Sequence, residues 1–228
     1  MKITKIERQR SGQKKVNIHA DGEYLIGIHV ETLVRFGLRV GDSLTKEHVR
    51  RIEEAEGLLA ARSSALRLLA TRPRTERELF ERLRQKEYSE DQIAAVLGEF
   101  KKSGLVNDDE FARMFVRNAL AVRPVGRIVL KRRMLLLGIS PALADLALAE
   151  VLEPAGEGQY AAEAAAKFLK KIRPGKKKDD EQQRRQRLTA FLLRRGYPWT
   201  VVEPVVRSAM NGEKTGGEEN MYDEREGQ

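Results

Sequence analysis

The sequence predicts a mostly helical fold, with three tandem three-helix repeats forming an elongated, curved body behind a small N-terminal β-hairpin and helix. Strong helix formers such as Leu, Ala, Arg, Lys and Glu are frequent among the 228 residues, whereas aromatic residues make up only 6%. From about residue 60 onward, apolar residues recur with the helical period and the segments resemble one another. These observations favour a repeat protein.

Residues 1–60 differ in kind from the rest. Short runs containing β-branched residues flank Asp21-Gly22, a dipeptide typical of type I′ hairpins, in which both central residues have positive φ. These runs predict a sheet of two or three strands. A short helix near Val30–Phe36 should follow, and Thr45 should cap a longer helix.

The repeated pattern is a helix, a tight turn and a second helix, aligned on an apolar anchor in each copy: Tyr88, Ile139 and Tyr197. Apolar residues agree at four further offsets: Leu79, Leu130 and Leu188; Leu83, Met134 and Leu192; Ile93, Ala144 and Val202; Val96, Ala147 and Val205. The residue before the anchor is Gly138 or Gly196 in two copies, which suits the left-handed end of a helix. In the first copy it is Glu87, where strain is expected. A further helix precedes each pair, over Ser63–Ala70, Asp109–Ala121 and Gln159–Ile172.

These patterns divide the chain into an N-terminal module, three repeats and a tail: 1–60, 61–107, 108–154, 155–210 and 211–228. A bundle of roughly 45–50 residues buries too little surface to be stable alone, so the repeats should stack on their neighbours. The tail is rich in Gly and acidic residues and lacks apolar periodicity, so we expect it to be disordered.

Composition excludes several classes of protein. The chain has no cysteine, which rules out disulfides and thiolate metal sites and fits a reducing compartment. The start has no apolar signal segment and no stretch is apolar enough to span a membrane, so a cytoplasmic protein is expected. No Gly-rich phosphate loop occurs, and His19, His29 and His48 belong to no catalytic or ligand pattern. We therefore expect no enzymatic activity, no cofactor and no metal.

The net charge of +9 is concentrated in the middle and later parts of the chain. Residues 111–144 contain seven basic residues and no acidic one: Arg113, Arg117, Arg123, Arg127, Lys131, Arg132 and Arg133. Cations without neighbouring carboxylates suit phosphate or acidic-protein contacts, and a merely solvated face is the alternative. Pro124 should occupy the first position of a helix on which Arg127 and Lys131 lie one turn apart.

A second basic cluster surrounds a Pro-Gly break: Lys167, Lys170, Lys171, Arg173, Lys176, Lys177 and Lys178. Acidic residues follow at once, so a solvated loop and a binding loop are both open interpretations. Arg184, Arg185, Arg187, Arg194 and Arg195 extend the positive charge along the third repeat. From these two groups we add five residues to the candidate contact surface: Lys176, Lys177, Arg184, Arg185 and Arg194.

Other conspicuous residues have structural interpretations. Thr75 and Glu78 have the spacing of a capping box, and Asp108 should be the N-cap of a helix whose first turn is acidic. Three aromatic residues at anchor or cap positions are expected in the core rather than stacked on bases: Tyr88, Tyr197 and Trp199.

The chain resembles the RecX family, bacterial regulators of the RecA recombinase. The resemblance is carried by Arg72-Pro73-Arg74-Thr75-Glu76-x-Glu78-Leu79, by Leu105–Asp109 followed by Phe111-Ala112, and by the segment around Gly138. It covers about residues 1–210 and is strongest between 62 and 152. Gly in place of Glu87 and Asp in place of Asn107 would be more typical of the family.

The resemblance implies a monomeric protein that binds the RecA–single-stranded DNA filament, in its groove or at its end. Such a protein limits filament extension and suppresses strand exchange, ATP hydrolysis and LexA cleavage, with weaker, salt-sensitive binding to single-stranded DNA. Two other classes stay open on the residues alone. One is a helix-turn-helix transcriptional regulator, against which the absence of a dimerisation segment counts. The other is a helical scaffold that does not bind nucleic acid.

Overall fold

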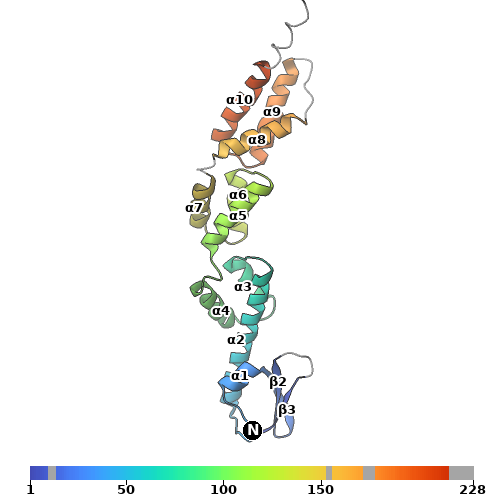
Figure 1. The fold of residues 1–228 in the computed structure, drawn as a ribbon, viewed down its shortest axis with the longest axis vertical. Coiled ribbons are helices and arrows are strands. Elements are labelled where there is room, and N and C mark those ends of the chain that lie inside the picture. The colour runs from blue at the N-terminus through green and yellow to red at the C-terminus, as the bar shows by residue number, and fades with distance from the viewer. Residues whose placement is uncertain (10–13, 153–155, 172–177, 216–228) are drawn as a thin grey trace, which may run out of the picture. The chain divides into compact units, whose positions relative to one another are not determined.

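The N-terminal residues form an antiparallel sheet because β-branched side chains alternate on either side of a tight turn. Strands β1 (Ile3–Arg8), β2 (Lys15–Ala20) and β3 (Glu23–His29) pair in the order β1-β2-β3. Figure 1 labels β2 and β3 of this sheet. Asp21 and Gly22 have φ of 52° and 90°, as the hairpin prediction requires. The computed structural model describes residues 1–9, 14–152, 156–171 and 178–215.

The sheet packs on two helices, α1 (Val30–Arg35) and the N-terminal part of α2 (Lys46–Thr71). Thr45 caps α2, since its side chain accepts a 3.1 Å hydrogen bond from the His48 N–H. The core between the sheet and α2 is aliphatic: Ile3, Val16, Ile18, Ile28, Leu44 and Ile52 are all buried. The predicted capped helix and the separately predicted helix over Ser63–Ala70 are one continuous helix, because helix-forming residues run without interruption between them.

The C-terminal part of α2 forms the first three-helix repeat with α3 (Glu76–Arg84) and α4 (Glu90–Lys102). The chain divides into two compact units, Met1–Val106 and Asn107–Gln228. The second unit contains the other two repeats. One is built from α5 (Asp108–Val122), α6 (Arg127–Leu136) and α7 (Pro141–Leu152), and the other from α8 (Glu157–Leu169), α9 (Lys178–Arg194) and α10 (Trp199–Thr215).

Equivalent positions of the three repeats form equivalent cores. Nine aligned residues have no exposed surface: Leu79, Leu130, Leu188, Leu83, Met134, Leu192, Ile93, Ala144 and Val202. At the fourth offset Val96 and Ala147 are buried, whereas Val205 is only partly buried and its neighbour Val206 takes the core position. Among the anchors, Ile139 and Tyr197 are buried, whereas Tyr88 is only partly buried. The repeat register predicted from the sequence is confirmed at the remaining aligned core positions.

The turns between paired helices also follow the prediction. Gly138 and Gly196 have φ of 92° and 83°, and Glu87 has φ of 64° in the same place. A non-glycine residue in this left-handed region is strained, because its Cβ crowds the backbone. Ser89 caps α4 with a capping box, and the Ser140 hydroxyl accepts from the Leu143 N–H at the start of α7.

Four local expectations are wrong. Asn107, not Asp108, caps α5, because the extended Asn107 places its side-chain oxygen 3.1 Å from the Asp109 and Glu110 N–H groups. Pro124 lies before α6, whose N-cap is Gly126. Trp199 is 59% exposed because it opens α10 on the outside, although Tyr197 is buried as expected. α10 continues to Thr215, past the predicted start of the tail at 211, and residues 216–228 lie outside the described part.

No helix in the described ranges is both long and apolar enough to cross a membrane.

Candidate functional site

The basic stretch 111–144 is carried by three adjacent pieces of the second unit. Arg113 and Arg117 lie on α5, Arg123 lies in the α5–α6 connection, and the other four lie on or at the start of α6. α6 is held in place by Leu130 and Met134, which are fully buried. These two residues are one turn apart and fix which side of α6 faces solvent.

Three of the seven cations are paired with acids that lie outside the acid-free stretch. Arg113 contacts Asp109 at 2.8 Å and also pairs with Glu150, and Lys131 contacts Asp145 at 2.6 Å. Hydrogen bonding to Glu150 raises the pKa of the Arg113 guanidinium above its ordinary value. Acidic residues absent from the linear stretch are therefore supplied by the fold, and the expectation that its charge is uncompensated is wrong for these positions.

Arg127, the third of these paired cations, has a structural role. Its side chain contacts Glu157 of α8 at 2.6 Å, and the Glu157 side chain is only 4% exposed. The other Glu157 oxygen accepts a 2.8 Å hydrogen bond from the Arg127 backbone N–H. Glu157 thus caps the N-terminus of α6 from the next repeat, in place of Gly126, which has no side chain to do so.

The cap is part of a close backbone junction between the second and third repeats. The Gly126 N–H donates to the Arg195 carbonyl at 2.9 Å, and the Ile128 N–H donates to the Gly196 carbonyl at 3.1 Å. A Cβ on Gly126 would lie 2.1 Å from the Gly196 oxygen, so only glycine fits there. The Arg195 guanidinium donates to the Pro124 carbonyl at 3.1 Å. Burial, and to a smaller extent the nearby charge of Arg123, lowers the pKa of the Arg195 guanidinium.

The remaining four cations are accessible to a partner. They are exposed, and among the described residues none of them has a carboxylate within ion-pair distance: Arg117, Arg123, Arg132 and Arg133. Exposed cations of this kind can exchange bound counterions for phosphate or carboxylate groups of a partner. We call these four residues the free arginine group.

The candidate residues of the third repeat are less completely defined. Arg185 and Arg194 are exposed on α9, and Arg184 is partly buried on the same helix. Lys176 and Lys177 lie outside the described residues, as does most of the Pro-Gly segment around them. Of the candidate contact residues, α9 therefore adds Arg185 and Arg194 as exposed cations, and Arg187 of the same helix is exposed as well.

α6 also carries an exposed apolar face that the sequence interpretation missed. Ile128, Leu135 and Leu136 are 55%, 37% and 73% exposed, and together with Lys131 and Arg132 they line a shallow depression of about 400 Å³. The periodicity indicated the buried Leu130 and Met134 instead. The sequence does contain a signal for this face, because apolar residues occur on both sides of this short helix.

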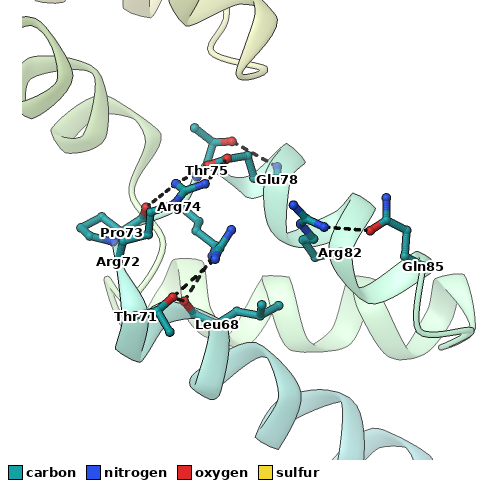
Figure 2. A network of polar contacts seen from close by, with 9 residues as sticks. All are labelled: Leu68, Thr71, Arg72, Pro73, Arg74, Thr75, Glu78, Arg82 and Gln85. Atoms are coloured by element: carbon teal, nitrogen blue, oxygen red, sulfur yellow. Dashed lines mark hydrogen bonds and ion pairs between the residues drawn. The ribbon is translucent and has the colours of Figure 1, made fainter. Parts of the chain in front are cut away.

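The motif that carries the family resemblance joins α2 to α3 (Figure 2). Both Glu78 oxygens accept from the Arg72 guanidinium, at 2.7 and 3.1 Å, and Thr75 and Glu78 complete the predicted capping box. Burial opposes ionisation of Glu78, but the bond from Arg72 holds its pKa below the ordinary value. Arg74 donates to the Leu68 carbonyl at 3.2 Å, near the end of α2. These contacts confirm a structural role for the motif.

Within the described ranges no group of three or more His, Cys, Asp or Glu side chains is arranged to hold a metal ion. The acidic run after Asn107 forms the first turn of α5, where negative charge is favourable to the helix dipole.

A small sheet followed by three-helix repeats with exposed basic residues defines a helical repeat protein. The chain belongs to the RecX family of regulatory proteins. It matches the RecX N-terminal domain over residues 1–45 and the first, second and third three-helix domains over 61–100, 107–148 and 159–206.

Relatives and solved structures agree with this assignment. The chain is 30% identical to the regulatory protein RecX of Clostridium beijerinckii, over 92% of this chain and 96% of the relative. The identity to that of Staphylococcus haemolyticus is 27%, over 98% and 80%. A crystal structure of regulatory protein RecX shares the fold, with a TM-score of 0.72, 24% identity and coverage of 90% and 98%. RecX from Lactobacillus salivarius gives a TM-score of 0.61 at 20% identity, over 68% and 97%.

Proposed function

We propose that this protein is a negative modulator of RecA, which binds the RecA–single-stranded DNA filament in its groove or at its end. It limits filament extension and thereby lowers strand exchange, ATP hydrolysis and LexA cleavage by RecA. It acts as a monomer in the cytoplasm and has no catalytic activity of its own. Membership of the RecX family supports this choice over a helix-turn-helix transcription factor or a scaffold.

The observation that carries the proposal is the free arginine group on α5, α6 and their connection. Four exposed guanidinium groups without carboxylate partners among the described residues are suited to an anionic partner. α9 adds Arg185 and Arg194, and we propose the same role for Lys176, Lys177 and Arg184. Arg113, Lys131 and Arg127 contribute less, because their charges are already used within the fold.

Binding to three partners at several salt concentrations tests the function. The partners are a single-stranded oligonucleotide, a duplex, and RecA filaments formed in advance on the oligonucleotide. We expect the filament to be bound most tightly, and RecA ATP hydrolysis to fall with far less than one protein per RecA monomer. Inhibition only when the protein exceeds the available DNA would indicate competition for the strand and contradict the proposal. Preference for the duplex would favour the transcription-factor class.

The free arginine group is tested by changing Arg117, Arg132 and Arg133 together to Ala. We expect weaker filament binding and a shallower dependence of affinity on salt, because fewer counterions are released. Ala favours the helix, so the melting temperature should change little. The matched control is Arg50→Ala with Arg51→Ala and Arg62→Ala, three exposed arginines of α2 that pair with glutamates. Wild-type filament affinity in both variants would show that the free arginine group is only solvated.

A further inference from the structure

The exposed apolar face of α6 consists of residues at helical spacing. Ile128, Lys131, Arg132, Leu135 and Leu136 follow one another at intervals of three, one, three and one, so they lie on one side of the helix. We call these five residues the α6 stripe. Leu136 is 73% and Ile128 is 55% exposed, so about half or more of each side chain is in contact with water in the free protein.

The three-helix fold does not require this stripe to be apolar. The equivalent residues of α3 are mostly polar: Arg77, Phe80, Glu81, Arg84 and Gln85. α9 has a depression of about 500 Å³ in the same place, and four of its six lining residues are of polar type: Gln182, Arg185, Gln186 and Thr189, beside Ala190 and Leu193. Scattered exposed leucines are ordinary, but three aliphatic side chains gathered around one depression mark a contact surface.

The chemistry of the stripe indicates a protein partner with apolar and acidic side chains. Removing aliphatic side chains from water is favourable, but a phosphodiester backbone offers no apolar surface that could cover them. The stripe also has no aromatic ring on which a base could stack. Arg132 is exposed and has no carboxylate partner in the described ranges, so it attracts a carboxylate of the partner. Lys131 and Asp145, exposed by 38% and 59%, form a surface pair that can rearrange at small cost.

A second copy of this chain fits the stripe poorly. Two-fold pairing of α6 with α6 would bring the cations of one stripe against those of the other, and like charges at close range are unfavourable. We infer that the α6 stripe binds an acidic, apolar protein surface. This inference rests on the proposed function, in which α6 would contact the protein subunits of the filament while the free arginines beside the stripe meet its charged groups.

The test removes the two most exposed aliphatic side chains of the stripe and keeps every charge. Ile128→Gln with Leu136→Gln is compared with a control that changes two exposed aliphatic residues elsewhere in the same unit, Val122→Gln with Leu146→Gln; their wild-type side chains are 88% and 54% exposed. Gln preserves helix formation. Affinity is measured by fluorescence anisotropy for RecA filaments formed on a labelled oligonucleotide, and separately for the naked oligonucleotide.

We expect the stripe variant to lose roughly tenfold or more in filament affinity, with naked-strand binding and melting temperature unchanged. The control should match the wild type, and Arg132→Glu should weaken filament binding further. Equal losses of affinity for the filament and for the naked strand would show that the stripe binds DNA. No loss of affinity would show that the stripe makes no contact with the filament.

Two other outcomes would place a different occupant on the stripe and overturn the inference. One is wild-type self-association, measured by light scattering, that the stripe variant abolishes. The other is tighter filament binding after removal of residues 216–228, seen only when the stripe is intact. Wild-type protein that binds no filament would instead contradict the proposed function itself, whereas wild-type binding with an unaffected variant contradicts the stripe alone.

Discussion

At the scale of single residues, Glu56 connects the N-terminal sheet to α2. Its carboxylate accepts hydrogen bonds from the His29 N–H at 2.9 Å and the Thr32 hydroxyl at 2.8 Å, contacts the His29 ring, and lies 3.7 Å from the Lys15 ammonium. Burial by itself would raise the pKa of Glu56, but these bonds together hold it below the ordinary carboxyl value. The contacts of Glu56 therefore stabilise the fold more when its carboxyl group is ionised.

Glu56→Gln should destabilise the N-terminal module by about 1–3 kcal/mol at neutral pH, because charged hydrogen bonds to a buried group are lost. A carboxyl group with a lowered folded-state pKa contributes stability above its unfolded pKa, near 4.5, and loses it as pH falls through the folded value. Urea unfolding between pH 7 and pH 3 should therefore show a steeper loss in the wild type than in the variant. Glu54→Gln on the same helix, with a side chain 62% exposed, is the control. Parallel pH curves for wild type and Glu56→Gln would contradict this role.

At the scale of the elements, the position of α6 depends on a single glycine before it. Gly126→Ala would place a methyl group 2.1 Å from the Gly196 oxygen and 2.3 Å from the Tyr197 nitrogen, both backbone atoms that cannot turn aside. We expect a loss of about 1–3 kcal/mol in the free energy of unfolding from overpacking at this contact.

The control for this substitution is Gly98→Ala on α4, where the added methyl group meets nothing within 4 Å. Because Ala favours a helix interior over Gly, Gly98→Ala should stabilise the protein by about 1 kcal/mol. Thermal melts should give a lower melting temperature for Gly126→Ala and a higher one for Gly98→Ala than for the wild type. A Gly126→Ala protein as stable as the wild type would show that the junction opens without cost.

The elements were predictable from the sequence where a local signal decides them. The Asp21-Gly22 hairpin, the Thr45 cap and the buried Leu83, Met134 and Leu192 all follow from nearest neighbours or from the helical period. The ion pairs of Arg127 and Lys131 were not predictable, because their partners Glu157 and Asp145 come from other helices.

Within the candidate site the same distinction holds. The sequence identifies the seven basic residues of 111–144, but only the fold separates the paired Arg127 from the exposed Arg132. Glu157 lies thirty residues beyond Arg127 and reaches it because α8 packs beside the start of α6. The apolar stripe was missed since periodicity finds the buried side of a helix, and α6 is apolar on two sides.

At the scale of the whole molecule, the chain consists of two compact units, and the second contains two repeats with separate cores. In a repeat protein, cooperativity between neighbours depends on the interface between them. Here that interface includes two backbone hydrogen bonds, to the Arg195 and Gly196 carbonyls, and the buried Glu157 carboxylate. The second and third repeats should therefore open together rather than separately.

Hydrogen exchange measured by mass spectrometry tests this coupling. In the wild type, peptides from α5–α7 and α8–α10 should show similar free energies of opening, because opening one repeat exposes the Glu157 and Gly126 contacts of the other. Glu157→Ala removes the cap from the Arg127 N–H and the partner from its guanidinium, so we expect a loss of about 2 kcal/mol and unequal opening of the two repeats. Glu163→Ala on the same helix, where the wild-type side chain is 60% exposed and lies 3.8 Å from Lys167, should leave both repeats as in the wild type. Trp199, the one tryptophan of the chain, lies on α10 and gives a second readout, since its fluorescence change in urea should separate from the circular dichroism transition only in Glu157→Ala. Unequal opening already present in the wild type would show that the two repeats are independent and that Glu157 stabilises only its own helix.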